Sequence, residues 1–466
     1  MARIPIFQTR YVLVFSFLSS IITACSTLGS EDLRLDKRTA EQFLSVLSRR
    51  VSLAEAKDMA SMKAPHITKN DIERINVEPI IDGDGDTLMY FVNYQEGWSI
   101  LSADKRTPYL IASSDYGNIS LSTDNPGLLS WLDMVALDMK KIIHSPDSSL
   151  NFTPERINAN IEQWNQFKNK KEPLRPPPSD PPILDGEWEL VATVTEEVVC
   201  DSLNHLMASQ WHQTYPYNYY CPPKPSGSGN CPAGCTPVAG GQMLAFLYNI
   251  FGIPVSFNYD DTEVYMSNLY LPYATDLSHP EVLNTARLLR MLGNELDAVY
   301  EDDFNTFFGY SGTSVLFPLT KLQNYYSSIG YSCIKQAYSA AKVKSNLIDG
   351  LPVLVSSYTT NSLGLPNYLR GHTYIIDGYK RFREKYTRYY ERIIGNPPQW
   401  QRKTEVSYSI PYIGAIKMNW GWITQWNGSN HNNDWYALTG DWIVFTGEEN
   451  ELISEDITIL CDFDYE

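Results

Sequence analysis

The chain has 466 residues, enough for two to four domains at roughly 100–200 residues each. Hydrophobic residues make up 43% and charged residues 20%, an ordinary globular balance that excludes disorder over most of the chain. With 37 basic and 54 acidic residues the net charge is −17, which argues against nucleic acid as a partner because like charges repel. The sequence has no long uninterrupted apolar run, so a protein with several membrane spans is excluded.

Residues 1–25 have the features of an export signal. Two arginines form a basic start, and a short apolar stretch from Tyr11 to Thr23 follows. This stretch suits a cleaved signal rather than a spanning helix. It ends in Ile22-Thr23-Ala24-Cys25, which resembles a bacterial lipobox, where the cysteine becomes lipid-modified. We therefore predict a lipoprotein signal peptide over 1–25 and a membrane anchor at Cys25, on the periplasmic side or cell surface; an ordinary secretory signal cut near Ala24 is the alternative.

The next part of the chain predicts a small α+β unit over residues 31–165. The apolar spacing predicts helices over 38–62 and 128–143, a hairpin of strands 87–94 and 98–103, and a strand over 109–113. The sequence Asp82-Gly83-Asp84-Gly85-Asp86 lacks the later glycine and glutamate of an EF-hand loop. We therefore expect a solvated turn there rather than a calcium site.

A proline-rich segment separates this unit from the rest of the chain. Six prolines fall between Pro173 and Pro182, directly after several lysines. So many prolines exclude helix and central strand, and we predict a stiff, exposed linker over 166–190 that is open to proteolysis.

The larger unit, residues 191–466, begins with predicted helices and continues with predicted strands. The helices are expected at 198–211, 235–250, 283–296 and from 343 to 348, and the strands at 353–358, 373–379, 407–412 and 415–419. Because helices and strands are segregated rather than alternating, the predicted fold class is α+β.

One cysteine has the setting of a nucleophile. Cys235 follows Gly234 at the start of a predicted helix, where the positive end of the helix dipole lowers the pKa of a thiol. The other cysteines offer less: Cys221 and Cys231 flank a Pro/Gly/Ser-rich loop, and the sequence leaves open whether they pair. Their spacing with Cys235 and His212 lacks the Cys-x-x-Cys of structural zinc sites. Nucleotide-binding motifs are also missing, so we expect neither a metal nor a cofactor.

Four further residues accompany this cysteine in the pattern of a Cys-His-Asn triad. His372 lies where a loop enters an apolar strand, at the roughly 130–150 residue spacing from the cysteine that papain-like peptidases have. Asn419 ends a later strand and is placed to orient an imidazole, with Trp420 next to it as a shield from water. Gln213 lies upstream of the cysteine, where its side-chain amide can stabilise an oxyanion.

These residues stand in longer motifs that resemble the streptopain-type cysteine peptidases. The motifs are Gln213-x-x-Pro216-Tyr217-Asn218, Gly234-Cys235, Gly371-His372 and Asn419-Trp420-Gly421-Trp422, with Trp98 to Arg106 and Ser114 to Gly117 matching the propeptide.

The resemblance implies a papain-like two-lobed catalytic domain made as a zymogen, with 31–165 as an inhibitory prodomain acting within the chain. It assigns Cys235 as nucleophile, His372 as general base and acid, Gln213 as oxyanion donor, Asn419 as the residue that orients His372, and Trp420 as its shield. Protein or peptide substrates follow. One departure from the family is the run Cys235-Thr236-Pro237, which differs from the usual start of the nucleophile helix.

Two other readings start from the same sequence. An exported, tyrosine-rich protein can be a glycan-binding surface module, and a peptidase fold can persist as a binding protein after losing its activity. Neither reading requires Gln213, Cys235, His372 and Asn419 in papain-like order, and all four are present.

Overall fold

A computed structural model gives the structure of the chain. It describes residues 49–63, 75–95, 97–114, 117–122, 126–150, 152–166, 187–225, 227–254, 256–300, 313–360, 366–394, 399–421, 435–437 and 457–465. Cys25 and the proline-rich linker lie outside these residues. Within them, no helix combines the length and the apolarity that a membrane crossing needs.

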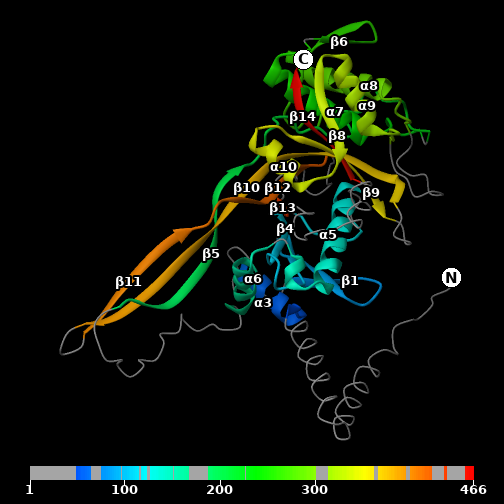
Figure 1. The fold of residues 1–466 in the computed structure, drawn as a ribbon. Coiled ribbons are helices and arrows are strands. Elements are labelled where there is room, and N and C mark those ends of the chain that lie inside the picture. Colours follow the sequence, from blue (N-terminus) through cyan, green and yellow to red (C-terminus); the bar gives the residue numbers. More distant parts are fainter. Residues whose placement is uncertain are drawn as a thin grey trace, which may run out of the picture. The chain divides into compact units, whose positions relative to one another are not determined.

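The elements follow one another as Figure 1 shows. The first part of the chain contains α3 (Leu53–Lys63), β1 (Asn76–Ile81), β2 (Thr87–Asn93), β3 (Trp98–Ser102), β4 (Leu110–Ser114), α5 (Pro126–His144), a short 3-10 helix (Asp147–Ser149) and α6 (Pro154–Gln166). The second part contains β5 (Glu189–Leu203), α7 (Cys235–Phe251), β6 (Ser256–Tyr259), β7 (Thr262–Tyr265), a 3-10 helix (Met266–Asn268), α8 (Pro280–Glu295), α9 (Pro318–Ser328), β8 (Tyr331–Ala337), α10 (Ala340–Ile348), β9 (Val353–Thr360), β10 (Pro366–Ile394), β11 (Gln399–Tyr408), β12 (Tyr412–Asn419), β13 (Trp435–Ala437) and β14 (Ile457–Tyr465).

The first part is an antiparallel meander with α5 packed against it. β1, β2, β3 and β4 pair in sequence order, so the predicted hairpin and the strand after it are confirmed. The predicted helix over 128–143 is α5. Its buried face includes Trp131, Val135 and Met139, at the helical spacing that buries one stripe.

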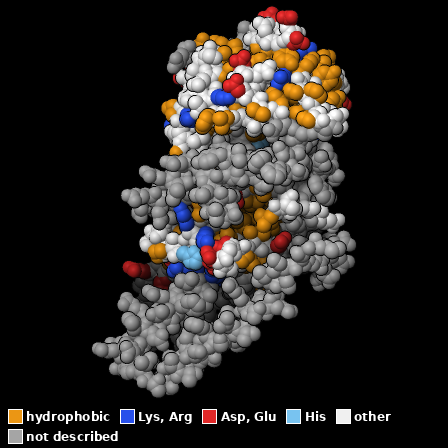
Figure 2. All heavy atoms as spheres, turned by 90° about the vertical axis from the view of Figure 1, so that its right-hand side faces the viewer, with side chains coloured by type: hydrophobic (Ala, Val, Ile, Leu, Met, Phe, Trp, Pro, Cys, Tyr) orange, Lys and Arg blue, Asp and Glu red, His pale blue; other side chains and the backbone are white. Residues whose placement is uncertain are grey.

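The aspartate-rich sequence between β1 and β2 forms a turn that α5 neutralises. The Asp82 carboxylate accepts hydrogen bonds from the backbone N–H groups of Asp84 and Asp86 at 2.9 and 3.0 Å. Lys140 Nζ lies 3.1 Å from Asp82 and 2.5 Å from Asp84, and His144 Nε2 lies 2.9 Å from Asp86. Figure 2 shows acidic, basic and histidine side chains together on this face. The turn is the one expected from the sequence, and the ammonium group of Lys140 lies among its carboxylates.

One continuous sheet joins the first part to the second. Its order is β1-β2-β3-β4-β13-β12-β10-β9-β14-β8. The junction is a short antiparallel ladder in which Trp435 pairs with Ser113 and Tyr436 with Ala112. The core follows the same plan, because one hydrophobic cluster contains Trp98 and Trp131 from the first part and Ile376 and Trp420 from the second.

A second hydrophobic cluster surrounds α7 and forms a helical lobe with α8 and α9. Two glycines let these helices approach closely: a Cβ on Gly240 would lie 2.5 Å from Leu322, and one on Gly241 would lie 2.8 Å from Leu289. The unusual start Cys235-Thr236-Pro237 is accommodated, because α7 begins at Cys235 and Pro237 sits in the first turn, where its missing N–H has no intrahelical partner. The α+β class and the division of the second part into a helical and a strand-rich lobe agree with the sequence prediction.

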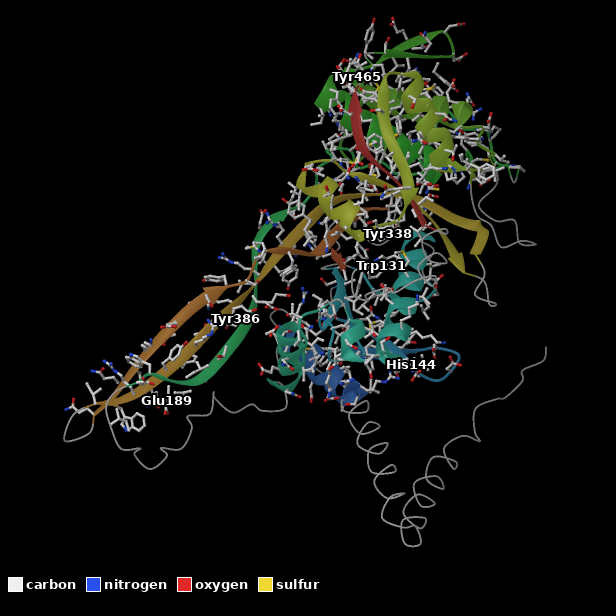
Figure 3. The ribbon with its side chains drawn as sticks, in the orientation of Figure 1. Trp131, His144, Glu189, Tyr338, Tyr386 and Tyr465 are labelled. Atoms are coloured by element: carbon white, nitrogen blue, oxygen red, sulfur yellow. The ribbon has the colours of Figure 1, made fainter. Side chains whose placement is uncertain are left out.

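The prediction of a helix over 198–211 was wrong. Residues 189–203 form strand β5, which pairs with β10 from Tyr379 to Glu391. The segment is rich in valine and threonine, whose branched side chains favour strands, and the long partner strand fixes the choice. β11 flanks the other side of β10 from Lys385 to Ile394, and Figure 3 labels Glu189 and Tyr386 on this three-stranded extension. The expected boundary at 190/191 falls inside β5.

The expected strand over 407–412 is interrupted: β11 ends at Tyr408 and β12 begins at Tyr412, and both run antiparallel along β10. Between them Ser409 stays bonded to Glu384 of β10: its backbone N–H donates to the Glu384 carbonyl at 2.9 Å, and its hydroxyl accepts from the Glu384 N–H at 2.8 Å. The other expected helices and strands of the second part appear as α7, α8, α10, β9, β10 and β12. The six cysteines that the structure describes are all free thiols.

Candidate active site

Cys235 is the first residue of α7, and the backbone before it is shaped for this position. Gly234 has φ +94°, a conformation that residues with a Cβ rarely adopt. A Cβ there would also lie 3.0 Å from Thr313. The glycine therefore turns the chain sharply into the helix and leaves the Cys235 side chain, which is partly exposed, at the positive end of the helix dipole.

His372 lies on β10 beside this thiol. Burial by itself raises the pKa of Cys235, but the charge of His372 and a hydrogen bond to its ring outweigh that effect, with smaller contributions from the Thr373 backbone and the Thr236 hydroxyl. The result is a pKa lowered to about 7. The hydroxyls of Thr236 and Thr373 also meet at 3.0 Å, which ties the start of α7 to β10 next to the pair.

The group that orients His372 differs from the prediction. Nε2 of His372 donates to the backbone carbonyl of Trp420 at 2.8 Å, so Nδ1 is the nitrogen left to face Cys235. The side chain of Asn419 lies elsewhere: its Nδ2 donates to the Ser209 carbonyl at 3.2 Å and to Gln242 at 3.0 Å. The expected contact from Asn419 to His372 is therefore replaced by one from the next residue's main chain.

The physical reason for this exchange is the side-chain amide of Gln242, which lies on the same helix as Cys235. Gln242 is fully buried in α7 and its Oε1 accepts from both Asn419 and the Trp211 N–H, at 3.0 and 3.1 Å. The Asn419 Oδ1 in turn accepts from the Gly421 N–H at 3.2 Å. The two side-chain amides thus join α7 to the end of β12. The residues next to Asn419 in the sequence do not indicate this partner, because Gln242 is far from Asn419 along the chain.

Gln213 is tied to the segment that leads into Cys235. Its backbone carbonyl accepts from the Ala233 N–H at 2.7 Å, which holds it next to the Gly234-Cys235 turn. Its side-chain nitrogen is buried and has no hydrogen-bond partner. A buried amide nitrogen without a partner is costly, and such groups in native proteins are often satisfied by a ligand. The neighbouring His212 is not a second base, because burial lowers its pKa to about 4.

Trp420 packs against an element of the first part of the chain as well as against His372. A Cβ on Gly127, in the first turn of α5, would lie 2.5 Å from both His372 Cδ2 and Trp420 Cε3. The start of α5 is therefore in direct contact with the candidate site. Nothing in the sequence around Gly127 indicates this, since the contact depends on how α5 docks.

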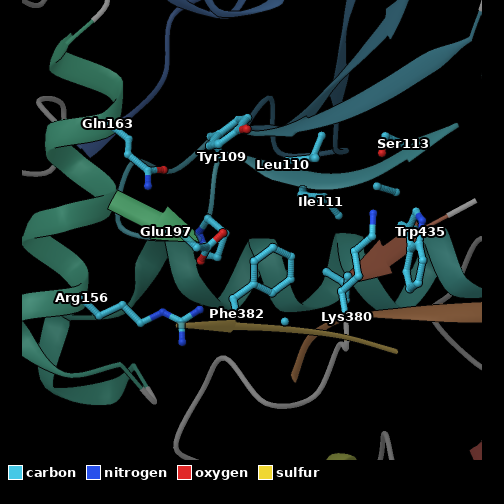
Figure 4. A pocket seen from close by; sticks show the side chains of 15 residues that line it. Tyr109, Leu110, Ile111, Ser113, Arg156, Gln163, Glu197, Lys380, Phe382 and Trp435 are labelled. Atoms are coloured by element: carbon cyan, nitrogen blue, oxygen red, sulfur yellow. The ribbon is translucent and has the colours of Figure 1, made fainter. Parts of the chain in front are cut away.

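Among the described residues no group of three or more metal-ligating side chains could hold an ion. The cavity in Figure 4, of about 130 Å³, lies apart from Cys235; β4 and α6 line one side of it, and β5, β10, β12 and β13 the other, with Arg156, Glu197 and Lys380 among its charged groups.

Two family profiles match parts of the chain. Residues 211–430 match the profile of the Peptidase C10 family, and residues 37–139 match that of the Spi protease inhibitor. No curated protein matches the chain. Among solved structures, a mutant fragment of Prevotella intermedia prointerpain A is 16% identical with a TM-score of 0.44, covering 83% of this chain and 98% of that one.

Active wild-type interpain A cysteine protease from the same organism is 17% identical with a TM-score of 0.34, covering 56% of this chain and 95% of that one. The two profiles divide the chain as the fold does, with the inhibitor-like residues over the β1–β4 meander and most of α5, and the peptidase residues over α7, β10 and β12. The chain therefore carries a Peptidase C10 domain over residues 211–430, preceded over residues 37–139 by a Spi inhibitor-like propeptide domain.

Proposed function

We propose that the protein is an exported cysteine endopeptidase made as a zymogen, with Cys235, His372 and Gln213 as its catalytic residues. The proposal is carried by the Cys235 thiol at the start of α7, whose pKa is lowered to about 7, together with the buried amide nitrogen of Gln213, which has no partner and whose main chain bonds Ala233 just before Cys235. One group is poised to attack a carbonyl, and the other is poised to bind the charge that the attack creates.

The chemistry follows from these positions. The Cys235 thiolate attacks the scissile carbonyl carbon and forms an S–C bond, and the carbonyl oxygen becomes an oxyanion held by the Gln213 amide and the Cys235 N–H. The C–N bond then breaks as His372 gives its Nδ1 proton to the leaving amine. Water attacks the thioester, its proton returns to His372, and the acid leaves with the thiolate restored.

The first experiment labels the protein with a peptide that carries a thiol-reactive electrophile and maps the modified cysteine. We expect a single labelled residue, Cys235, and loss of peptide hydrolysis in Cys235→Ala with the fold retained. Labelling of no cysteine, or hydrolysis by Cys235→Ala at a rate comparable to wild type, would contradict the proposal. The first of those results favours a binding protein with a peptidase fold.

Latency is explained by the contact between α5 and the site. The first turn of α5 lies against His372 and Trp420, so it occupies space beside the imidazole. We expect wild type to cut itself between α6 and β5 and to mature to a fragment of about 30 kDa, at ~110 Da per residue after signal loss. Cys235→Ala should stay near 50 kDa by the same arithmetic, unless another peptidase cuts it. Maturation of the purified variant alone would contradict self-processing.

Export rests on the signal sequence, and anchoring rests on Cys25. Cys25→Ser should move the protein from the membrane fraction to the soluble fraction, because one lipid-bearing thiol is lost. Unchanged membrane association would show that another segment provides the anchor.

A further inference from the structure

Tyr436 lies at the meeting point of the strand-rich lobe and the first part of the chain. It is buried on β13, and its ring makes an edge contact with Trp131 of α5 at 4.8 Å between centroids. On the other side its ring lies 5.4 Å from Trp420, and its hydroxyl accepts a hydrogen bond from Trp420 Nε1 at 3.1 Å.

Trp420 is the residue that holds the imidazole. Its backbone carbonyl accepts from His372 Nε2 at 2.8 Å, and its indole packs on Tyr374 at 4.6 Å. Gly421 follows with φ +60° and closely faces Val238, so the main chain turns immediately after the carbonyl. The position of Trp420 therefore depends on the side chains that pack around its indole. The Tyr436 hydroxyl is the hydrogen-bonding partner of that indole.

We propose that Tyr436 is a positioning residue for the peptidase reaction, which fixes His372 by holding the indole of Trp420. The inference rests on the proposed function, because it needs Cys235 and His372 to act as a pair. Without the Tyr436 hydroxyl the indole gains freedom, the Trp420 carbonyl moves with it, and the imidazole loses the bond that keeps Nδ1 toward the thiol. Fewer imidazolium–thiolate pairs then form at a given pH.

The test uses the full-length chain and measures the rate of iodoacetamide alkylation of Cys235 against pH, read by peptide mapping. Tyr436→Phe keeps the ring and removes only the hydroxyl. Tyr326→Phe is the matched control, since Tyr326 is also fully buried and its hydroxyl donates to the Gly240 carbonyl of α7 at 2.9 Å, within the core of the helical lobe. We expect the alkylation midpoint of Tyr436→Phe to rise by about one pH unit, a tenfold loss of thiolate below the midpoint, while Tyr326→Phe follows wild type.

A double-mutant cycle makes the result independent of general loss of packing. Trp420→Phe removes the donor at the other end of the bond, so adding Tyr436→Phe to it should cause little further shift. The inference is overturned if Tyr436→Phe follows wild type, if both tyrosine variants shift equally, or if the two shifts in the cycle simply add. A wild-type midpoint near that of an ordinary thiol overturns the proposed Cys235–His372 pair, and this inference with it.

Discussion

At the scale of single residues, the Cys235 thiol is governed by two opposing effects. Burial raises its pKa, and His372 lowers it by charge and hydrogen bonding until the pKa reaches about 7. Because the two effects act on the same atom, removing His372 leaves only the effect of burial, which raises the pKa of the Cys235 thiol.

We therefore predict that His372→Ala raises the pKa of Cys235 above the ordinary value for a thiol. The thiolate fraction at neutral pH should fall, and alkylation of Cys235 should need more alkaline solution than in wild type. The measurement is the alkylation rate of Cys235 against pH, and His279→Ala, at the start of α8, is the control. An unchanged midpoint in His372→Ala would mean that His372 does not ionise the thiol.

A second prediction at this scale concerns Gln213. Gln213→Ala removes the amide nitrogen that has no protein partner, and losing one oxyanion donor costs about 2.7–4 kcal/mol, or roughly 10²–10³ in kcat. KM and the alkylation profile of Cys235 should change little, because the amide acts on the transition state. A rise in KM with kcat unchanged would assign Gln213 to substrate binding instead.

At the scale of elements, α5 links inhibition to the site through one glycine. Because the backbone of Gly127 touches the rings of His372 and Trp420, any side chain there must displace rings that are packed on several sides. The first part of the chain can thus cover the site because the backbone of α5 at Gly127 packs directly against the rings of His372 and Trp420.

Gly127→Ala should weaken this docking and raise the activity of the uncut chain. Overpacking costs about 1–3 kcal/mol, equivalent to roughly 5- to 150-fold weaker docking. The initial rate of peptide hydrolysis, measured while gels show the chain intact, gives the result. Gly83→Ala is the control, since a Cβ on Gly83 meets nothing within 4 Å. Equal rates of hydrolysis for the two variants would show that the docking of α5 does not inhibit the uncut chain.

At the scale of the whole molecule, the first and second parts share a sheet and a core. β4 pairs with β13, and Trp131 lies in the same hydrophobic cluster as Ile376 and Trp420. The hydrogen-bonded junction itself is only a short ladder, so most of the attachment comes from buried apolar surface.

Trp131→Ala should therefore lower stability and release activity together. Truncating a buried tryptophan costs about 3–5 kcal/mol, and the edge contact with Tyr436 is lost as well. Trp164→Ala in α6 is a matched control, because both indoles are buried and neither Nε1 has a hydrogen-bond partner. Both variants should have a lower Tm, but only Trp131→Ala should raise hydrolysis by the uncut chain. Equal activity in the two would contradict a role for the shared core in latency.

The sequence by itself determined the elements whose signals are local. The helix at Cys235 and the hairpin between Thr87 and Ser102 follow from helix-start and alternation patterns that a few neighbouring residues carry. The proposal of Cys235, His372 and Gln213 as catalytic residues likewise rests on local motifs. The aspartate-rich turn before β2 was predictable for the same reason.

Tertiary structure decided what depends on distant partners. β5 is a strand because β10 runs beside it over its whole length, whereas its own pattern allowed a helix. Asn419 bonds Gln242 rather than His372 because α7 carries a buried amide to that position, and the Trp420 carbonyl takes the imidazole instead. Gly127 and Tyr436 reach the site only through the docking of α5 and β13. These features depend on hydrogen bonds and packing between segments that are far apart in the chain. The local sequence around each residue therefore does not predict them.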